Sequence, residues 1–504
     1  MFGQRLNFFR RGGRRGDILR VYRGAFDEAA ESGNPDVKIR AFSQVVDFCA
    51  SSGLCRTDDS IKRNKVMYWT YNNLGDAWVA KTYQNPSEKN DALRKAVGCY
   101  REAVNVARDE AEKINSLQRI AAIYKQIGDV GNLNKTREAI VLTLGDEYDL
   151  VCPSEYMIMK LMSEDRLEPF SNDFYDKNIK ENYYSRGVSP YIKNVFDDLK
   201  ISGESLSRYG AGYMWGVMGL VYNPSAVSKE DVRHWSVLLD EKYRKQVTMK
   251  DSVRDSYLVA LTILKEKKLL SEEFQKAMET THCLTDELND TSEQTVTKVQ
   301  TILEKMRENS YSLETDSGKA DMVTGKVVLN MQWSGDGVYT MDEAEKDGLE
   351  LSYAVPEEGS NLWFDGFCMM KNGISGDAKK KQAAQAFINY ISRPDNVIRN
   401  MYYVGYTSVI AGGDSNLIFR YADWCYGAEE DEEEVSPYDL SYFFSGAKET
   451  KNKYVLEVPK SQASRQVSAQ YPEQSVLKRS AVMQCFSGEA NRRISRMWIR
   501  VRCF

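Results

Sequence analysis

The sequence has few of the residues that catalytic and metal sites need. Its two histidines, His234 and His282, share no ligand spacing, so neither a zinc site nor a histidine-based catalytic triad is indicated. It also contains no Walker loop and no GxGxxG, HExxH or GxSxG motif. We therefore expect no enzymatic activity, no metal and no cofactor.

Long apolar runs are missing as well. No stretch approaches the roughly 18 consecutive apolar residues of a membrane-spanning helix. The first residues, MFGQRLNFFRRGGRRGD, are basic and lack the apolar core of a signal peptide. From these two absences we expect a chain that is cytoplasmic as written.

Neither cysteine nor charge indicates a specialised class. The nine cysteines form no CxxC pair and have no regular spacing, which is typical of reduced or buried thiols. Lysine and arginine number 68 against 73 acidic residues, and the resulting net charge of −5 argues against a nucleic-acid partner. At 504 residues the chain has room for about three folded units.

The N-terminal part divides into a tail and a helical domain. Residues 1–16 carry five arginines and several glycines, which predicts a basic flexible tail. The tail is either an unstructured leader, which we favour, or a contact for anionic lipid or RNA. Residues 17–145 have the periodicity of paired helices, interrupted by loop signals that contain Gly and Pro.

Two segments of this helical domain resemble a tetratricopeptide repeat. Tyr71–Trp78 (YNNLGDAW) and Ala96–Ala103 (AVGCYREA) match its two helices, and a weaker unit follows over 117–129. In such a pair Gly75 lets the helices approach while Tyr100 fills the gap between them. The domain either binds a protein or peptide partner or acts as a spacer, because repeat scaffolds carry no chemistry by themselves.

From residue 146 onward the pattern changes to alternating strands and helices. These elements are predicted at 149–152, 253–268, 271–280, 327–331, 381–392 and 491–501. The predicted fold class is multidomain, with an all-α helical-hairpin region followed by an α/β region over 146–504. The acidic run at 429–434 is expected to be a solvated loop without a site, since adjacent carboxylates repel one another.

Aromatic residues recur beside carboxylates in the α/β region. Trp333 and Asp336 follow a predicted strand. Trp363 and Asp365 share one face of another strand, because residues i and i+2 point the same way. Each ring or carboxylate alone is typical of a core or turn residue. Together they suit a linear polyamine, whose ammonium groups bind carboxylates and ring faces.

Residues 146–498 resemble the substrate-binding proteins of spermidine and putrescine ABC transporters. The motifs that carry the resemblance are Tyr148–Tyr156, Tyr213–Gly216, Gly219–Pro224, Asp251–Asp255, Trp333–Asp336, Trp363–Gly366, Phe387–Asp395 and Gly405–Thr407. The resemblance implies a two-lobed, periplasmic-binding-protein-like α/β clamp with lobe crossings near 222–250 and 335–365. It also implies non-catalytic polyamine binding between the lobes. Delivery to the membrane subunits of an ABC transporter would follow, from a periplasmic or extracellular membrane-associated position.

The resemblance further implies which side chains line the cleft. The first lobe supplies a Ser-x-Tyr motif, the second lobe an aspartate at a helix start, and the Trp and Asp motifs add rings and carboxylates. The implied ligand-binding residues are Ser154, Tyr156, Asp255, Trp333, Asp336, Trp363, Asp365 and Tyr406. The alternative is an interaction protein whose helical repeats recruit a partner, with the clamp as a sensor or a relic.

The front of the chain departs from this family. Asp17–Tyr22 resembles the family's first strand, but Arg23-Gly24 stands where the family has an Asn-Trp turn, and helical residues follow. Either a helical domain has been inserted into or substituted for the front section, or Ile18–Tyr22 is the first helix of the repeat region. We favour substitution, and we expect it to weaken binding because unpaired backbone groups in a lobe are costly.

Overall fold

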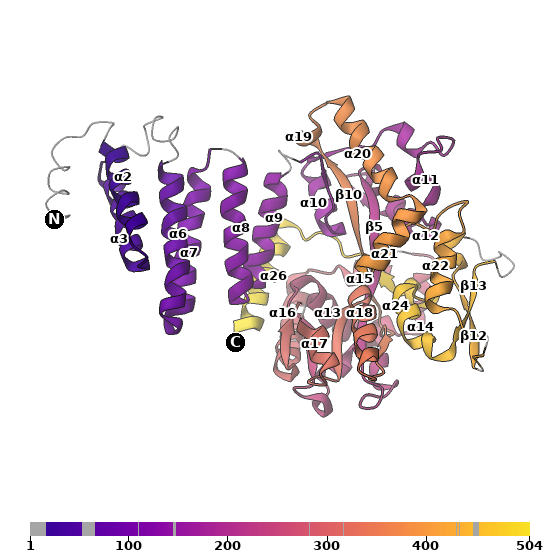
Figure 1. Ribbon diagram of the computed structural model, residues 1–504. Helices are drawn as coiled ribbons and strands as arrows, with labels where there is room; N and C mark the ends of the chain where they lie inside the picture. Colours follow the sequence, from indigo (N-terminus) through magenta and orange to yellow (C-terminus); the bar gives the residue numbers. More distant parts are fainter. Residues whose placement is uncertain are drawn as a thin grey trace. The chain divides into compact units, whose positions relative to one another are not determined.

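The computed structural model describes residues 17–52, 66–108, 110–144, 148–281, 283–315, 317–429, 431–432, 434–446 and 453–503. These residues belong to two compact units, one within 1–147 and one within 148–504 (Figure 1). The predicted basic tail lies outside the described residues. Among the helices of the described ranges, none combines the length and the apolar character needed to cross a lipid bilayer.

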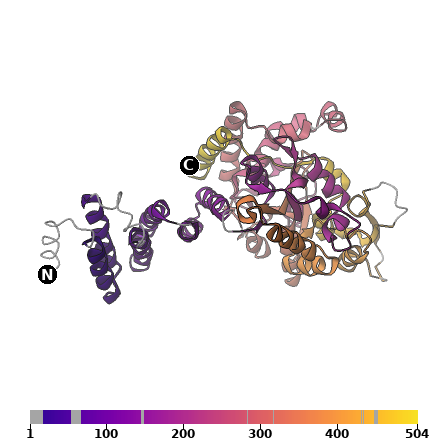
Figure 2. The same ribbon diagram turned by 90° about the horizontal axis from the view of Figure 1, so that it is seen from above.

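Helices are the only regular secondary structure in the described residues of the N-terminal unit. They are α2 (Asp17–Glu31), α3 (Pro35–Ser52), α6 (Val66–Gln84), the short 3-10 helix η1 (Pro86–Glu88), α7 (Lys89–Val106), α8 (Glu110–Ile127) and α9 (Val130–Leu144). Each α-helix packs against the next one along the chain, and the two views show them side by side (Figures 1 and 2). The predicted strand at Asp17–Tyr22 is wrong: this segment forms the first turns of α2, as the alternative reading had it. Six residues are too few for periodicity to separate a strand from a helix.

The close packing of α6 against α7 depends on Gly75. A Cβ atom at this position would lie 2.5 Å from Cε1 of Tyr100, a distance at which the ring or the helix must move. The Tyr100 hydroxyl in turn donates a hydrogen bond of 2.6 Å to Oδ1 of Asp76. Glycine therefore gives the Tyr100 ring its place between the two helices. The assignment of this pair as a tetratricopeptide repeat stays a prediction.

The second unit is a mixed α/β fold. Its strands are β1 (Leu150–Val151), β2 (Leu167–Glu168), β3 (Lys200–Ile201), β4 (Glu204–Ser205), β5 (Gly210–Tyr222), β6 (Val247–Lys250), β7 (Ser312–Glu314), β8 (Leu329–Trp333), β9 (Ser352–Ala354), β10 (Ser360–Met370), β11 (Thr407–Ser408), β12 (Val435–Asp439), β13 (Val455–Pro459) and β14 (Ser480–Ala481). Its helices are α10 (Glu155–Ser163), α11 (Tyr183–Gly187), α12 (Pro190–Asp198), α13 (Val253–Leu269), α14 (Glu272–Met278), α15 (Cys283–Leu288), α16 (Glu293–Asn309), α17 (Ser317–Val323), α18 (Ser334–Lys346), α19 (Lys371–Ile374), α20 (Ala378–Ile391), α21 (Pro394–Val404), α22 (Leu417–Tyr426), α23 (Ser441–Phe444), α24 (Gln466–Gln470), α25 (Gln474–Lys478) and α26 (Gly488–Cys503).

Strands β5 and β10 form a long antiparallel pair in this unit (Figure 1). Toward Gly210, β1, β2 and β11 flank the pair; toward Tyr222, β5 pairs with β8 and β9. We call the part around β1, β2 and β11 the first lobe and the part around β6 to β9 the second lobe. Strand β5 changes partners at 217–218, just ahead of the predicted crossing at 222–250. Strand β10 begins inside the predicted range 335–365.

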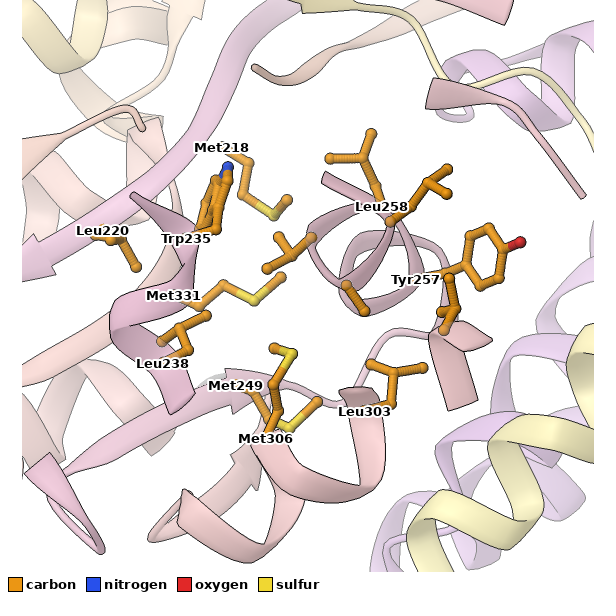
Figure 3. Packing of buried hydrophobic residues seen from close by; sticks show 14 of the residues in the cluster. Met218, Leu220, Trp235, Leu238, Met249, Tyr257, Leu258, Leu303, Met306 and Met331 are labelled. Carbon is orange, nitrogen blue, oxygen red and sulfur yellow. The ribbon is translucent and has the colours of Figure 1, made fainter. Parts of the chain in front are cut away.

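A buried core fills the second lobe between α13, α16 and the strands β5, β6 and β8 (Figure 3). Trp235 is fully buried there, with Leu258 of α13 and Met331 of β8 in the same cluster. Helix α13 starts after Ser252, whose side chain accepts a hydrogen bond of 3.5 Å from the backbone of Asp255. The core and this cap together fix where the first turn of α13 lies.

Candidate ligand-binding site

Trp333 and Asp336 lie where β8 ends and α18 begins. Trp333 is the last residue of β8 and pairs across the sheet with Met218 of β5. Asp336 is in the first turn of α18, where the helix dipole favours a negative charge. The indole nitrogen of Trp333 donates a hydrogen bond of 3.4 Å to Oδ1 of Asp255, at the start of α13. The second lobe thus joins the Trp333 ring to the Asp255 carboxylate, and Asp336 follows Trp333 at a second helix start.

Ser154 and Asp365 contact each other in the first lobe. Ser154 precedes α10, and its hydroxyl donates a hydrogen bond of 2.6 Å to Oδ1 of Asp365 in β10. Their backbones also form an isolated antiparallel bridge. Burial raises the pKa of Asp365, and the hydrogen bond from Ser154 opposes this by stabilising the charged form.

Tyr406 contacts both Trp363 of β10 and Asp336 of the second lobe. Its ring lies edge-on to that of Trp363, with 5.5 Å between the ring centroids and 75° between the planes. Its hydroxyl donates a hydrogen bond of 3.0 Å to Oδ1 of Asp336. Gly335 makes room for Tyr406, because a Cβ atom there would overlap the tyrosine ring. Trp363, Tyr406 and Asp336 therefore form one connected series.

Tyr156 contacts the second lobe through a residue that the sequence did not single out. The guanidinium of Arg254 lies 4.4 Å from the centroid of the Tyr156 ring, and Arg254 precedes Asp255 in α13. Arg254 also donates a hydrogen bond of 2.9 Å to the carbonyl oxygen of Met483. A cation from the second lobe thus stacks on the aromatic ring that the first lobe supplies.

Two lysines that sequence reasoning missed also contact the predicted residues. The ammonium of Lys319 lies 3.1 Å from Oδ1 of Asp336. That of Lys250 lies 4.2 Å from the centroid of the Trp333 ring and forms a fully buried ion pair of 3.0 Å with Glu314. Neither lysine carries a local signal, since each meets its partner only through the folding of the second lobe.

Glu155, between Ser154 and Tyr156, was missed as well. Its side chain is 3% exposed, and one carboxylate oxygen accepts a hydrogen bond of 3.3 Å from the backbone of Phe364. Burial raises the pKa of Glu155 to about 8, while the charge of Arg254 opposes the shift. No local pattern points to this residue, because its burial depends on the approach of β10, which carries Phe364. A separate small pocket in the first lobe, whose lining includes Tyr213 and Asn400, contains none of the eight predicted residues.

Two lobes share a long strand pair, and the series Trp363, Tyr406 and Asp336 joins rings and a carboxylate across them, an arrangement typical of two-lobed binding proteins. Residues 126–414 match the family of bacterial extracellular solute-binding proteins, and the chain belongs to that family. This confirms the resemblance noted from the motifs. The match begins at residue 126, ahead of the predicted boundary at 145.

Several similar proteins are named for binding polyamines. The spermidine/putrescine-binding periplasmic protein of Salmonella typhimurium is 24% identical over 274 residues, which cover 54% of this chain and 67% of the relative. The putrescine-binding periplasmic protein PotF of Escherichia coli is 22% identical over 332 residues, covering 63% of this chain and 78% of the relative. A solved spermidine/putrescine ABC transporter substrate-binding protein of Streptococcus pneumoniae is 22% identical with a TM-score of 0.49, covering 74% of this chain and 88% of that one. The two sequence relatives are periplasmic by name, so the expected cytoplasmic location finds no support.

Proposed function

We propose that the chain binds a linear polyamine, putrescine or spermidine, without catalysis, at the group formed by the eight predicted residues. One observation carries the proposal: rings and carboxylates from both lobes form hydrogen-bonded or ring-contacting sets, with Tyr406 between Trp363 and Asp336. Carboxylates bind ammonium groups, and flat rings cover the methylenes between them. The polyamine names of the relatives support the same ligand class.

The biological role that fits this binding is delivery of the polyamine to an ABC transporter. The ligand would pass from the lobes to the membrane subunits, with the chain in the periplasm or outside the cell. The family and the names of the relatives support this role.

Thermal unfolding of the full chain with and without putrescine or spermidine tests the proposal. A ligand at about 100 times its Kd adds about 2.7 kcal/mol to the free energy of unfolding, so the melting temperature rises. The matched control is 1,4-butanediol, which keeps the spacing of putrescine but has no charge. A rise with neither polyamine, or an equal rise with the diol, would contradict polyamine binding.

A second candidate function is recruitment of a partner by the N-terminal helices. Trp69 and Tyr83 of α6 are exposed, and their separation of 14 residues places them on nearly the same side of the helix. Exposed aromatic rings on one helix face are typical of a protein-binding surface. Polyamine binding separates the two functions, because a scaffold with a relic clamp shows no stabilisation by either polyamine.

A further inference from the structure

Three side chains with metal-binding atoms meet in the second lobe, outside the group of eight residues. One ligand atom each from His234, Glu266 and Glu358 lies within 4.8 Å of the others. Nδ1 of His234 is 3.0 Å from Oε1 of Glu358, although 124 residues separate them in sequence. The sequence predicted no metal site because the histidines lack ligand spacing. The three side chains come together only in the folded chain, because they are far apart in sequence.

Two hydrogen bonds join the chain segments that carry His234 and Glu358. The backbone of Glu357 donates a hydrogen bond of 2.8 Å to the carbonyl oxygen of Arg233. The indole of Trp235, which Figure 3 shows in the buried core, donates one of 2.8 Å to the carbonyl oxygen of Gly359. His234 and Glu358 are the middle residues of these two joined segments. A site held this way loses little conformational entropy when it binds.

The third side chain, Glu266, comes from the C-terminal half of α13. Leu258, Leu261 and Leu269 of this helix lie in the same buried core as Trp235. Leu261 and Leu269 flank Glu266 along the helix, and their packing in the core fixes the position of the Glu266 backbone. The same core therefore holds helix α13, which carries Glu266, at a fixed position relative to the segment that carries His234.

Glu358 is a buried carboxylate whose charge is not fully compensated by the described residues. Its side chain is 2% exposed, and its Oε2 atom accepts no hydrogen bond from them. The nearby guanidinium of Arg479 donates to the carbonyl oxygens of Val355 and Pro356. A bound cation would compensate the two carboxylates.

We propose that His234, Glu266 and Glu358 bind one divalent transition-metal ion of the zinc class. One imidazole nitrogen and two carboxylate oxygens suit zinc, whereas calcium and magnesium prefer oxygen ligands alone. Ligand bonds of about 2.0–2.1 Å require these atoms to approach one another slightly. His234 and Glu266 are only half-buried, which leaves room for this movement and a route for the ion.

The metal site and the polyamine group can be tested separately. Asp255 and Glu266 are eleven residues apart on α13, which corresponds to about 16 Å along the helix axis. The proposal does not depend on polyamine binding, and a variant without the metal site should keep its response to putrescine.

Calorimetric titration of the full chain, freed of metal with a chelator, tests the site with Zn²⁺ and, in parallel, with Ca²⁺. We expect one equivalent of Zn²⁺ to bind and Ca²⁺ to bind far more weakly. His234→Gln and Glu266→Gln should each weaken Zn²⁺ binding at least about tenfold. Glu358→Gln should do the same while folding normally, because it removes a buried charge.

The matched control is Glu357→Gln, which changes the neighbouring carboxylate that pairs with Arg233 at 2.8 Å. It should leave Zn²⁺ affinity unchanged. Absence of Zn²⁺ binding to the parent chain would overturn the proposal. Equal Zn²⁺ affinity in His234→Gln and Glu357→Gln would also overturn it, since the ion would then bind elsewhere.

Discussion

The ammonium of Lys319 lies 3.1 Å from Oδ1 of Asp336, the same oxygen that accepts a hydrogen bond from Tyr406. The two side chains of this ion pair are 22% and 14% exposed, so water screens the pair only in part. A cation of the chain itself therefore contacts a carboxylate that we assign to the ligand. An ammonium group of a polyamine has to compete with Lys319 or share the carboxylate with it.

Replacing Lys319 by Met should strengthen putrescine binding. The variant removes the lysine from Asp336 while the hydrogen bond from Tyr406 remains, and a partly exposed ion pair is worth about 1 kcal/mol, so the Kd should fall about threefold to tenfold. Calorimetric titration measures the change. Lys326→Met is the control, because Lys326 forms its ion pair of 3.3 Å with Asp321, which is not one of the eight predicted residues. An unchanged or larger Kd in Lys319→Met would show that Lys319 does not compete with the ligand.

Replacing Asp336 by Asn should weaken putrescine binding by about 1.5–3 kcal/mol, the contribution of a hydrogen bond to a charged group. Calorimetric titration gives this difference directly. Glu343→Gln, on the same helix, removes a surface carboxylate that pairs with Lys346 and should not change the affinity. Equal affinity in the Asp336→Asn variant would place this carboxylate outside the site.

Replacing each of two tryptophans by Ala separates a core role from a binding role. Trp363 is 9% exposed, so its loss should cost about 3–5 kcal/mol of unfolding free energy. Trp333 is half-buried, so its loss should cost less stability but lower putrescine affinity by about 0.5–2 kcal/mol. Trp424→Ala is the control, since this ring is 73% exposed. Chemical denaturation and titration decide the case, and a large stability loss with unchanged affinity in Trp333→Ala would assign that ring to the core.

The sequence was informative where the relevant residues are neighbours in the chain. The pairs Trp333 with Asp336 and Trp363 with Asp365 were proposed from strand and helix-start geometry, which relates residues that are close in sequence. In the structure Asp336 accepts a hydrogen bond from Tyr406 and Asp365 one from Ser154, so the two pairs themselves stay predictions. The strand at 327–331 was predicted two residues early relative to β8, which is the usual uncertainty of element ends.

The sequence was silent where folding joins distant segments. Nothing local links Asp336 to the Tyr406 hydroxyl, or His234 to Glu358, because these contacts depend on how distant segments fold together. Burial of Glu155 likewise depends on the approach of β10, whose Phe364 backbone donates to its carboxylate. Tertiary contacts of this kind carry no periodic signal.

Replacing Gly75 by Ala should destabilise the N-terminal unit by about 1–3 kcal/mol, because the new methyl group would overlap the Tyr100 ring. Gly98→Ala is the control: a Cβ atom there meets no atom of the described residues within 4 Å, and alanine favours the helix by about 0.5–1 kcal/mol. Denaturation followed by far-UV circular dichroism compares the two variants. Stabilisation by both substitutions would show that α6 and α7 can separate at no cost.

Replacing Glu155 by Gln should change how stability depends on pH. Burial raises the pKa of Glu155 from 4.5 to about 8 in the folded state. Below about pH 4.5 the carboxyl is protonated in both the folded and the unfolded chain, so it adds no pH dependence there. Between these values only the folded chain keeps the proton, and the free energy of unfolding falls by up to about 1.4 kcal/mol per pH unit as the pH rises.

Glutamine cannot titrate, so the Glu155→Gln variant should lose this slope and be more stable than the parent chain near pH 8. Urea denaturation at several pH values between about 5 and 8.5 measures the slope for both proteins. This is roughly the range in which the folded chain keeps the proton and the unfolded chain has lost it. Glu164→Gln is the control, because Glu164 lies exposed just beyond the end of α10. If the variant at position 155 keeps the slope of the parent chain, Glu155 is ionised in the folded protein and the buried carboxyl contributes nothing to its pH dependence.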